Sequence, residues 1–265
     1  MKISCGNIDN GKEFDWGRAS GDYARYRDIY PDEFYEKITG LGLCVEGQKV
    51  LDLGTGTGVL PRNLYRYGAR FVGADISENQ IAEARRLTRE LGMDIDYIVS
   101  SAEDLDFPDE SFDVVTASQC YMYFEMKIVL PKLHRILKED GHFCILYTAW
   151  LTDESKIARK TEKLVLKYNP FWTGGNSKRC HIKMPELTDE YFSVEHDLIF
   201  DVGIPFTRES WNGRIRACRG IGASSLSDRE IETFEKEHMK FLNSVNKEFV
   251  IPHFVTLLDL KKKKR

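Results

Sequence analysis

Three alternating glycines, at positions 54, 56 and 58, end the segment Asp52–Gly58 and directly follow the largely apolar run Val50–Leu53. Glycine allows tight turns and lets a ligand approach the backbone without a Cβ in the way. A helix is expected to begin at Val59, and its N-terminus favours a negative group such as a carboxylate. In open α/β sheets ligands bind beyond the carboxyl ends of the strands, where this loop would lie. The segment therefore predicts a loop that binds a small molecule.

A second acid, Asp75, ends the apolar run Phe71–Asp75, about 20 residues after the first glycine of that loop. An acid at this position can accept hydrogen bonds from both hydroxyls of a ribose. The alternative is a capping role for the next helix, which Ser77 is equally able to fill. We therefore predict that Asp75 binds a ribose, and that Ile76 and Gln80 also contact the cofactor.

The spacing of the glycines discriminates between cofactors. A dinucleotide-binding loop has the pattern G-x-G-x-x-G, which disfavours a nicotinamide dehydrogenase here. The pattern in this chain is G-x-G-x-G after an acid, and Leu51–Gly58 resembles motif I of class I S-adenosylmethionine methyltransferases. A glycine-rich turn without a ligand is the alternative. The resemblance implies that five residues of this motif contact S-adenosylmethionine: Asp52, Gly54, Thr55, Gly56 and Gly58.

Two further segments resemble the same family. Ser101–Pro108 is similar to the segment after its third strand, usually Asp-Ala-Glu-x-Leu-Pro-Phe, where a backbone N–H and a side chain read the adenine. Ala102 and Glu103 match, but Ser101 replaces the common Asp, so the acceptor for the adenine amino group stays open. After the fourth strand the family contacts the methionine portion, which implies a contact for Gln119. The alternative for the residues after the third strand is a solvated loop. The alternative for Gln119 is a buried polar side chain that is bonded to backbone.

The N-terminal segments Phe14–Gly17 and Asp22–Pro31 resemble the entry segment of small-molecule methyltransferases of the ubiquinone/menaquinone and trans-aconitate type. In that group the segment folds over the cofactor. The resemblance implies that Tyr23 lies near the sulfonium, because an aromatic face attracts a cation. It also implies that Arg27 binds the methionine carboxylate. Either residue could instead lie on the surface of a helix.

The acceptor pocket of this family is usually built by an insertion after the fifth strand. Aromatic walls suit a planar or apolar acceptor, and arginines suit a carboxylate. We therefore predict four substrate contacts: Tyr121, Trp150, Trp172 and Arg214. On a helix Arg216 and Arg219 would share a face from which Arg214 is displaced, and most of these arginines are expected to be solvated.

A general base is needed if the acceptor is a hydroxyl or an acidic carbon. His181 is the candidate catalytic residue for that role, and a surface histidine in a loop is the alternative.

Strands and helices alternate from Lys49 to Thr148, which predicts a parallel sheet covered on both faces. We therefore expect a doubly wound, mostly parallel α/β sheet of the Rossmann-like methyltransferase type, with an N-terminal helical segment and an inserted cap after strand five. The expected parts are a helical lid at 1–45, a cofactor-binding core at 46–150 and 190–265 with acceptor-cap helices near 207–242, and an insertion at 151–189.

Composition limits the class of protein. The 265 residues are 42% hydrophobic and 30% charged, which is ordinary for a soluble globular chain. A net charge of -4 disfavours nucleic acid as a partner. The six cysteines form no C-x-x-C pair and have no histidine at a metal-ligand spacing, so we expect reduced thiols in a cytoplasm, with no metal site and no disulfide framework. Neither a signal peptide nor an apolar membrane span is expected.

The predicted reaction is transfer of the methyl group of S-adenosylmethionine to a small-molecule acceptor by in-line displacement. Two other readings of the same motifs stay open. One is a module that binds S-adenosylmethionine without catalysis, and the other is an RNA or protein methyltransferase. The acceptor, the methylated atom and the oligomeric state stay open.

Overall fold

The computed structural model describes residues 2–6 and 8–264. It divides into two compact units, which are described separately. Unit 1 comprises Met1–Pro31, Ala149–Lys178 and Asp201–Phe254, and unit 2 comprises Asp32–Thr148, Arg179–Phe200 and Val255–Arg265. The division cuts the predicted N-terminal lid, because residues 1–31 belong to unit 1 and the rest of that segment to unit 2.

The strands form a seven-stranded sheet in the order β3-β2-β1-β4-β5-β7-β6. Their bounds are β1 Lys49–Leu53, β2 Arg70–Asp75, β3 Asp96–Val99, β4 Phe112–Ser118, β5 Leu137–Trp150, β6 Phe192–Thr207 and β7 Glu248–Lys262. The pairs β1–β2, β1–β4, β2–β3 and β4–β5 are parallel. The predicted mostly parallel α/β sheet is confirmed. The strand order reverses between β1 and β4, which is where such sheets bind ligands.

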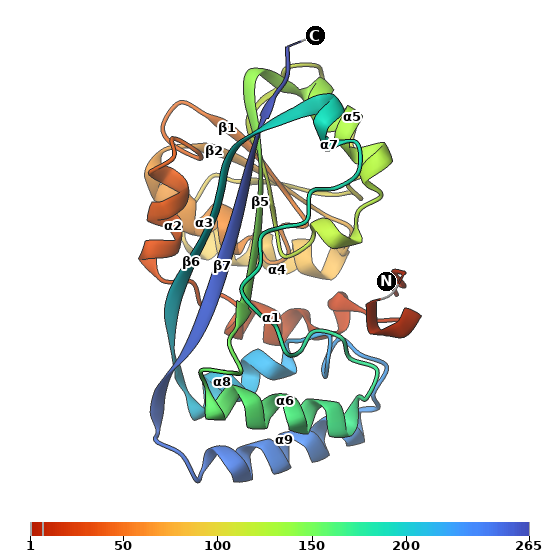
Figure 1. Ribbon diagram of the computed structural model, residues 1–265, viewed down its shortest axis with the longest axis vertical. Coiled ribbons are helices and arrows are strands. Elements are labelled where there is room, and N and C mark those ends of the chain that lie inside the picture. Colours follow the sequence, from red (N-terminus) through yellow and green to blue (C-terminus); the bar gives the residue numbers. More distant parts are fainter. Residues whose placement is uncertain (1, 7, 265) are drawn as a thin grey trace. The chain divides into compact units, whose positions relative to one another are not determined.

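Helices flank the strands of unit 2 (Figure 1). They are α2 Asp32–Thr39, α3 Val59–Leu64, α4 Glu78–Glu90, α5 Met126–Ile136 and the short α7 Thr188–Tyr191, with 3-10 turns at Tyr65–Tyr67 and Tyr121–Tyr123. Ser77 caps α4 by accepting a hydrogen bond from the Gln80 N–H, as the sequence predicts. This removes the alternative in which Asp75 is the cap.

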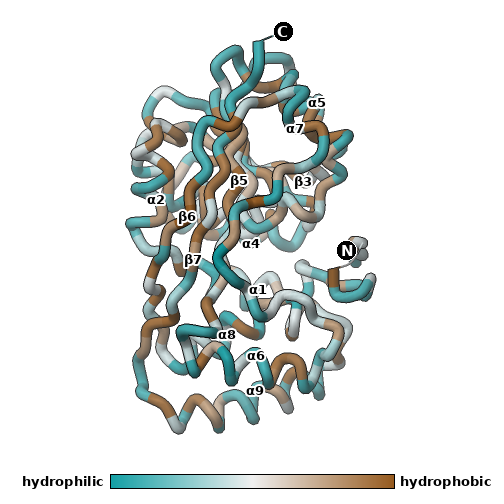
Figure 2. The backbone as a smooth tube through the Cα atoms, viewed as in Figure 1, coloured by the Kyte–Doolittle hydropathy of each residue, from teal (hydrophilic) through white to brown (hydrophobic). Residues whose placement is uncertain are grey.

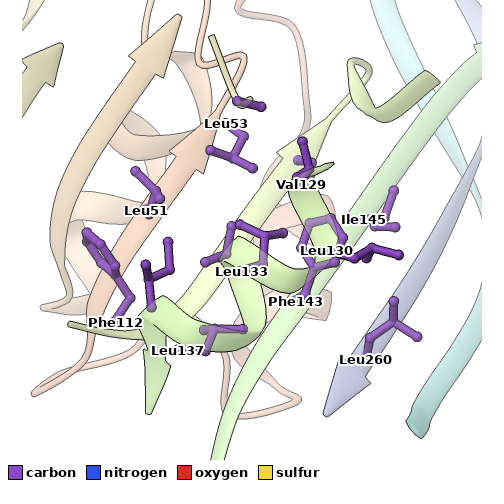
Figure 3. Close-up of a cluster of buried hydrophobic side chains, with 14 of the residues drawn as sticks. Leu51, Leu53, Phe112, Val129, Leu130, Leu133, Leu137, Phe143, Ile145 and Leu260 are labelled. Atoms are coloured by element: carbon purple, nitrogen blue, oxygen red, sulfur yellow. The ribbon is translucent and has the colours of Figure 1, made fainter. Parts of the chain in front are cut away.

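The core of unit 2 fixes the strand ends that carry the predicted site. Leu51 and Leu53 of β1, Phe112 of β4 and Phe143 of β5 are fully or almost fully buried. They pack with Leu133 of α5 in one cluster (Figure 3). Burying a side chain of this kind contributes about 1.5–3 kcal/mol. Leu53 is the last residue of β1, so this apolar cluster holds the carboxyl end of that strand.

One buried carboxylate lies among the last three strands of the sheet. Asp259 of β7 is fully buried, and its two oxygens contact His142 Nδ1 of β5 at 2.8 Å and His196 Nδ1 of β6 at 3.0 Å. A buried carboxylate is costly unless it is hydrogen-bonded. These contacts therefore hold Asp259 in place and link β7 to both neighbouring strands.

Unit 1 contains α1 Ser20–Tyr26, α6 Lys156–Tyr168, α8 Arg208–Arg216 and α9 Asp228–Leu242, with 3-10 turns at Ile8–Gly11 and Trp16–Ala19. Helix α9 packs against α6 and α8, and α8 packs against α1 (Figure 1). Hydrophobic residues dominate much of β7, whereas α9 carries both hydrophobic and hydrophilic residues (Figure 2). The apolar side of α9 includes the buried Phe234 and Leu242, as expected for an amphipathic helix.

Helix α9 begins with a capping box, as the sequence Ser227-Asp-Arg-Glu230 indicates. Ser227 accepts from the Glu230 N–H, and the Glu230 carboxylate accepts from the Ser227 N–H. We expect Ser227→Ala to lower the free energy of unfolding by about 1 kcal/mol, because one backbone donor of the first turn loses its partner. Urea unfolding measures this, with Ser244→Ala, an exposed serine beyond α9, as the control. Equal stability of Ser227→Ala and wild type would contradict the assignment.

Candidate functional site

The backbone of the loop after β1 requires its three glycines. Gly54, Gly56 and Gly58 have φ values of 57°, 56° and 74°, in the left-handed region that disfavours other residues. A Cβ on Gly58 would lie 2.3 Å from Tyr97 Oη of β3, and a Cβ on Gly54 would lie 2.7 Å from Cys120 Cβ. The alternating glycines therefore allow both the turn and close packing behind it.

Asp52 is buried at the end of β1. Its Oδ1 accepts a hydrogen bond from Thr116 Oγ1 of β4 at 2.6 Å, and Thr55 in the glycine loop is a second partner. Burial raises the pKa of Asp52 to about 7, with a smaller contribution from the nearby Asp75, although hydrogen bonds from the two threonines oppose the rise. In unit 2 the carboxyl group ties β1, β4 and the loop together. Its predicted contact with the cofactor stays a prediction.

Asp75 ends β2 beside the same loop. Its Oδ2 accepts from the Gly56 N–H at 2.9 Å, and its Oδ1 accepts from the Ser77 N–H at 2.8 Å. Burial raises its pKa, and these two hydrogen bonds oppose the rise. Each carboxylate oxygen has a second lone pair, so both can still accept from a hydroxyl. The neighbouring Ile76 is 37% exposed, which offers an apolar surface next to that carboxylate.

The residues after β3 make local contacts. Ser101 Oγ donates to Asp104 Oδ2 at 2.7 Å and accepts from the Asp104 N–H. Glu103 Oε1 accepts from the Glu125 N–H at 2.7 Å, and Ala102 is buried. The side chains of Ser101 and Glu103 thus hold the loop in shape, and the predicted adenine contacts stay predictions.

Gln119 follows β4 with a φ of 66°, and its Nε2 donates to the Thr148 carbonyl oxygen at 2.7 Å. Gln119 is therefore bonded to backbone, which is the alternative given for it above. This bond uses its Nε2 and not its Oε1. Gln80 is buried in the first turn of α4. Tyr121 is half-buried in the 3-10 turn after Cys120, and burial raises the pKa of its hydroxyl.

His181, the candidate base, is exposed in unit 2. Its Nδ1 lies 2.7 Å from Asp197 Oδ1, so a carboxylate orients the ring. A base with such a partner can hold a proton, but the exposure also fits a histidine on the surface. Its catalytic role stays a prediction.

Unit 1 holds three of the four predicted substrate contacts and both predicted cofactor contacts of the N-terminal segment. The Trp150 ring lies 6.4 Å from the Trp172 ring, and the Arg214 Cζ lies 5.2 Å from the Trp150 ring centroid. The Arg27 Cζ lies 4.7 Å from the Tyr23 ring centroid. Cations and aromatic faces at such distances attract each other.

The expectation that most of the arginines are solvated is wrong. Arg214 is only 7% exposed, since α8 presents it to the interior of unit 1. Arg219 is largely buried with its Nε 2.7 Å from Asp9 Oδ2. Arg216 is partly exposed between Asp22 and Glu235. The helix period alone did not reveal this, because the acids come from distant segments.

The comparisons with known proteins agree with this geometry. Residues 51–145 match the family model described as a methyltransferase domain. The chain is 34% identical to the methyltransferase phqN of Penicillium fellutanum over 58% of this chain and 49% of that protein. It is 27% identical to a ubiquinone biosynthesis O-methyltransferase of Bartonella bacilliformis over 63% of this chain and 67% of that protein.

Residues 51–145 form a methyltransferase domain. The crystal structure of the YcgJ protein of Bacillus subtilis has the same fold as this chain, with a TM-score of 0.54 at 18% identity, covering 89% of this chain and 100% of that one. The chain spans 49% to 67% of the length of the first curated relatives that it matches.

The methyltransferase domain presents groups that fit S-adenosylmethionine, the cofactor that the resemblance of its glycine motif implies. Asp75 can accept from ribose hydroxyls, the exposed Ile76 beside it can pack on the adenine, and the Gly54–Gly58 loop carries no side chain on its glycines. The bound cofactor supplies an electrophilic methyl group on a sulfonium. Among the described residues, no three His, Cys, Asp or Glu side chains are placed to hold a metal ion. No helix in that part of the chain is long and apolar enough to cross a membrane.

Three residues that support the loop of the methyltransferase domain escaped the sequence analysis. Thr116 donates to Asp52, Tyr97 packs on Gly58, and Cys120 Sγ donates to the Leu53 carbonyl oxygen at 3.1 Å. None belongs to a recognisable motif, and each reaches the loop from another strand or from the segment after one. Only the register of β1, β3 and β4 brings them there.

A methyl group at Gly58 tests how tightly the loop is packed. We expect Gly58→Ala to lower the free energy of unfolding by about 2 kcal/mol or more, because left-handed backbone and the contact with Tyr97 both disfavour a Cβ. Chemical denaturation measures the change. Gly92→Ala is the matched control, because Gly92 has a φ of 64° with nothing within 4 Å of its Cβ position. Equal losses for both variants would show that the Tyr97 contact is unimportant.

Proposed function

We propose that this protein transfers the methyl group of S-adenosylmethionine to a small-molecule acceptor. The observation that carries the proposal is the loop at the end of β1, where the Gly56 N–H is bonded to the Asp75 carboxylate at 2.9 Å. This arrangement supports the proposal, because an acid that is able to accept from ribose hydroxyls lies beside an open glycine backbone at the switch point of the sheet.

In this proposal three groups of residues in unit 2 contact the cofactor. They are the glycine loop with Asp52 and Thr55, the acid Asp75 with Ile76 and Gln80, and the residues after β3 and β4, namely Ser101, Ala102, Glu103 and Gln119. Tyr23 and Arg27 of unit 1 serve the sulfonium and the methionine carboxylate. The sulfonium is a good leaving group, so alignment and desolvation of the acceptor supply much of the catalysis.

The acceptor is proposed to contact Tyr121, Trp150, Trp172 and Arg214, with His181 as the base if a proton must be removed. The name of the Bartonella relative refers to ubiquinone biosynthesis, which supports a small molecule over RNA or protein as the acceptor. The net charge of -4 also disfavours RNA.

The proposed location is the cytoplasm. All six cysteines are free thiols, and Cys44, Cys120, Cys144 and Cys218 are buried. A reducing compartment keeps thiols in that state. Cell fractionation with an antibody to the protein would test the location, and recovery from a secreted fraction would contradict it.

A label-transfer assay tests the function. The full chain is incubated with S-adenosylmethionine carrying a tritiated methyl group and with the small-molecule, RNA and protein fractions of one cell extract. We expect label to enter the small-molecule fraction with wild type and to fall sharply with Asp75→Ala. Label in RNA or protein instead would support the other methyltransferase reading. Tight binding of S-adenosylhomocysteine with no transfer to any fraction would indicate a module without catalysis.

A further inference from the structure

Arg214 of α8 is a buried cation with incomplete pairing. Its Nη1 donates to Cys218 Sγ at 2.9 Å, and its Nε, like that of Arg216, has no hydrogen-bond partner among the described residues. Its guanidinium faces the ring of Trp150. Burial lowers the pKa of Arg214, and the nearby positive charge of Arg27 lowers it further. Helices α1 and α8 also pack against each other, and a Cβ on Gly213, next to Arg214, would lie 2.3 Å from the ring of Tyr26, next to Arg27. The two arginines are therefore carried by neighbouring segments of unit 1.

Arg27 is half-buried, and its contacts are with an aromatic residue. Its Nη2 donates to Tyr23 Oη at 3.4 Å, a long hydrogen bond, and its Cζ lies near the same ring. Within the part of the chain that the structure describes, neither Arg27 nor Arg214 has a carboxylate at ion-pair distance. The pair thus concentrates positive charge that no acid of unit 1 neutralises.

The neighbouring arginines of unit 1, Arg216 and Arg219, do form ion pairs with carboxylates. Arg216 lies 2.9 Å from both Asp22 and Glu235, and Arg219 lies 2.7 Å from Asp9. A guanidinium stays charged and carries five donors, and burying one without a counter-ion costs several kcal/mol. The difference between the paired and the unpaired arginines indicates that an external anion completes the unpaired set.

We propose that Arg27 and Arg214 form a binding site for a small organic carboxylate, whose apolar or planar part packs against Trp150. The site rests on the proposed function in naming its two candidate occupants, a carboxylate of the methyl acceptor and the methionine carboxylate that Arg27 is proposed to bind. Arginine forks bind carboxylates through two parallel hydrogen bonds, and an aromatic wall suits the rest of such a molecule. The methionine carboxylate of the cofactor has the same chemistry, so the test must separate the two sources.

Calorimetric titration of the full chain with benzoate tests the site, at constant ionic strength in chloride, with benzyl alcohol as the uncharged probe. Hydrogen bonds to charged groups are worth about 1.5–3 kcal/mol, so we expect benzoate affinity to fall about tenfold or more in Arg214→Met and in Arg27→Met. Arg216→Met is the matched control, and it should bind benzoate as wild type does. Benzyl alcohol should distinguish none of the variants.

A second titration identifies the source of the carboxylate. Unchanged affinity for S-adenosylhomocysteine in Arg214→Met supports a site for the acceptor. A loss of that affinity, with 5′-methylthioadenosine binding unchanged, supports the anion site but assigns it to the cofactor carboxylate. Arg214→Lys, which keeps the positive charge, replaces Arg214→Met if the latter does not fold. Benzoate affinity equal to that of wild type in the folded variants of Arg27 and Arg214 would overturn the site. These titrations measure binding and not methyl transfer. A failure of the proposed function in the label assay can therefore be told apart from a failure of the anion site.

Discussion

Asp75→Ala is expected to weaken the binding of S-adenosylhomocysteine by about 100-fold, because two charge-assisted hydrogen bonds of about 1.5 kcal/mol or more each would be lost. The Asp75 carboxylate also holds the Gly56 N–H and the Ser77 N–H, so the loop would lose its fixed position as well. Isothermal titration calorimetry measures the affinity. Circular dichroism and the midpoint of thermal unfolding check that the variant is folded.

Two further variants make the result specific. Asp75→Asn keeps the size of the side chain but loses the charge and half of its acceptor oxygens, so an intermediate loss of affinity is expected. Asp140→Ala removes an exposed acid of unit 2 that lies outside every segment assigned to the cofactor, and it should bind as wild type does. Wild-type affinity of a folded Asp75→Ala protein would rule out the ribose role.

Asp52 is expected to make the stability of the fold depend on pH near neutrality. Its pKa rises from 3.8 to about 7 on folding, chiefly because the carboxyl group is buried. A raised pKa means that the folded state binds the proton more tightly than the unfolded state does. The stabilising contribution is therefore complete below the unfolded pKa and is lost as the pH rises through the folded pKa.

The size of this effect follows from the change in pKa. A change of roughly 3 units corresponds to about 4 kcal/mol between pH 4 and pH 8, as an order of magnitude. We expect the stability of wild type minus that of Asp52→Asn to fall by this amount over that range. Urea unfolding at a series of pH values measures it for both proteins. Parallel stability curves would contradict the assignment.

Thr116→Val sharpens this test. The Thr116 hydroxyl donates to Asp52 at 2.6 Å, and it lowers the pKa that burial raises. Without this donor the pKa of Asp52 should rise further, so the loss of stability with rising pH should extend to higher pH. Asp106→Asn is the control for the general effect of removing one negative charge.

Much of the domain could be predicted from local sequence. The glycine spacing predicted the loop, because three residues in the left-handed region within five positions require glycine, and the resemblance of Leu51–Gly58 to motif I implied the cofactor. The alternation of strands and helices predicted the parallel sheet, since each apolar run of β1 and β4 must be covered on both faces. The caps at Ser77 and Ser227 were also predictable, because a cap depends on residues within one helical turn.

Contacts between distant segments were decided by the tertiary structure alone. The sequence predicted that most of Arg214, Arg216 and Arg219 are solvated, yet α8 buries Arg214 and the acids near the other two come from the N-terminal segments and from α9. Asp259 likewise meets two histidines only because β5, β7 and β6 are neighbours in the sheet.

The sequence by itself predicted the methyltransferase fold and implied S-adenosylmethionine as the cofactor, because these predictions use patterns within single segments. The tertiary structure decided which charges are buried, which are paired, and how the Asp52–Gly58 loop is supported from β3 and β4. The physical reason is that burial and ion pairing depend on residues far apart in the chain, and no local pattern records which of them will meet.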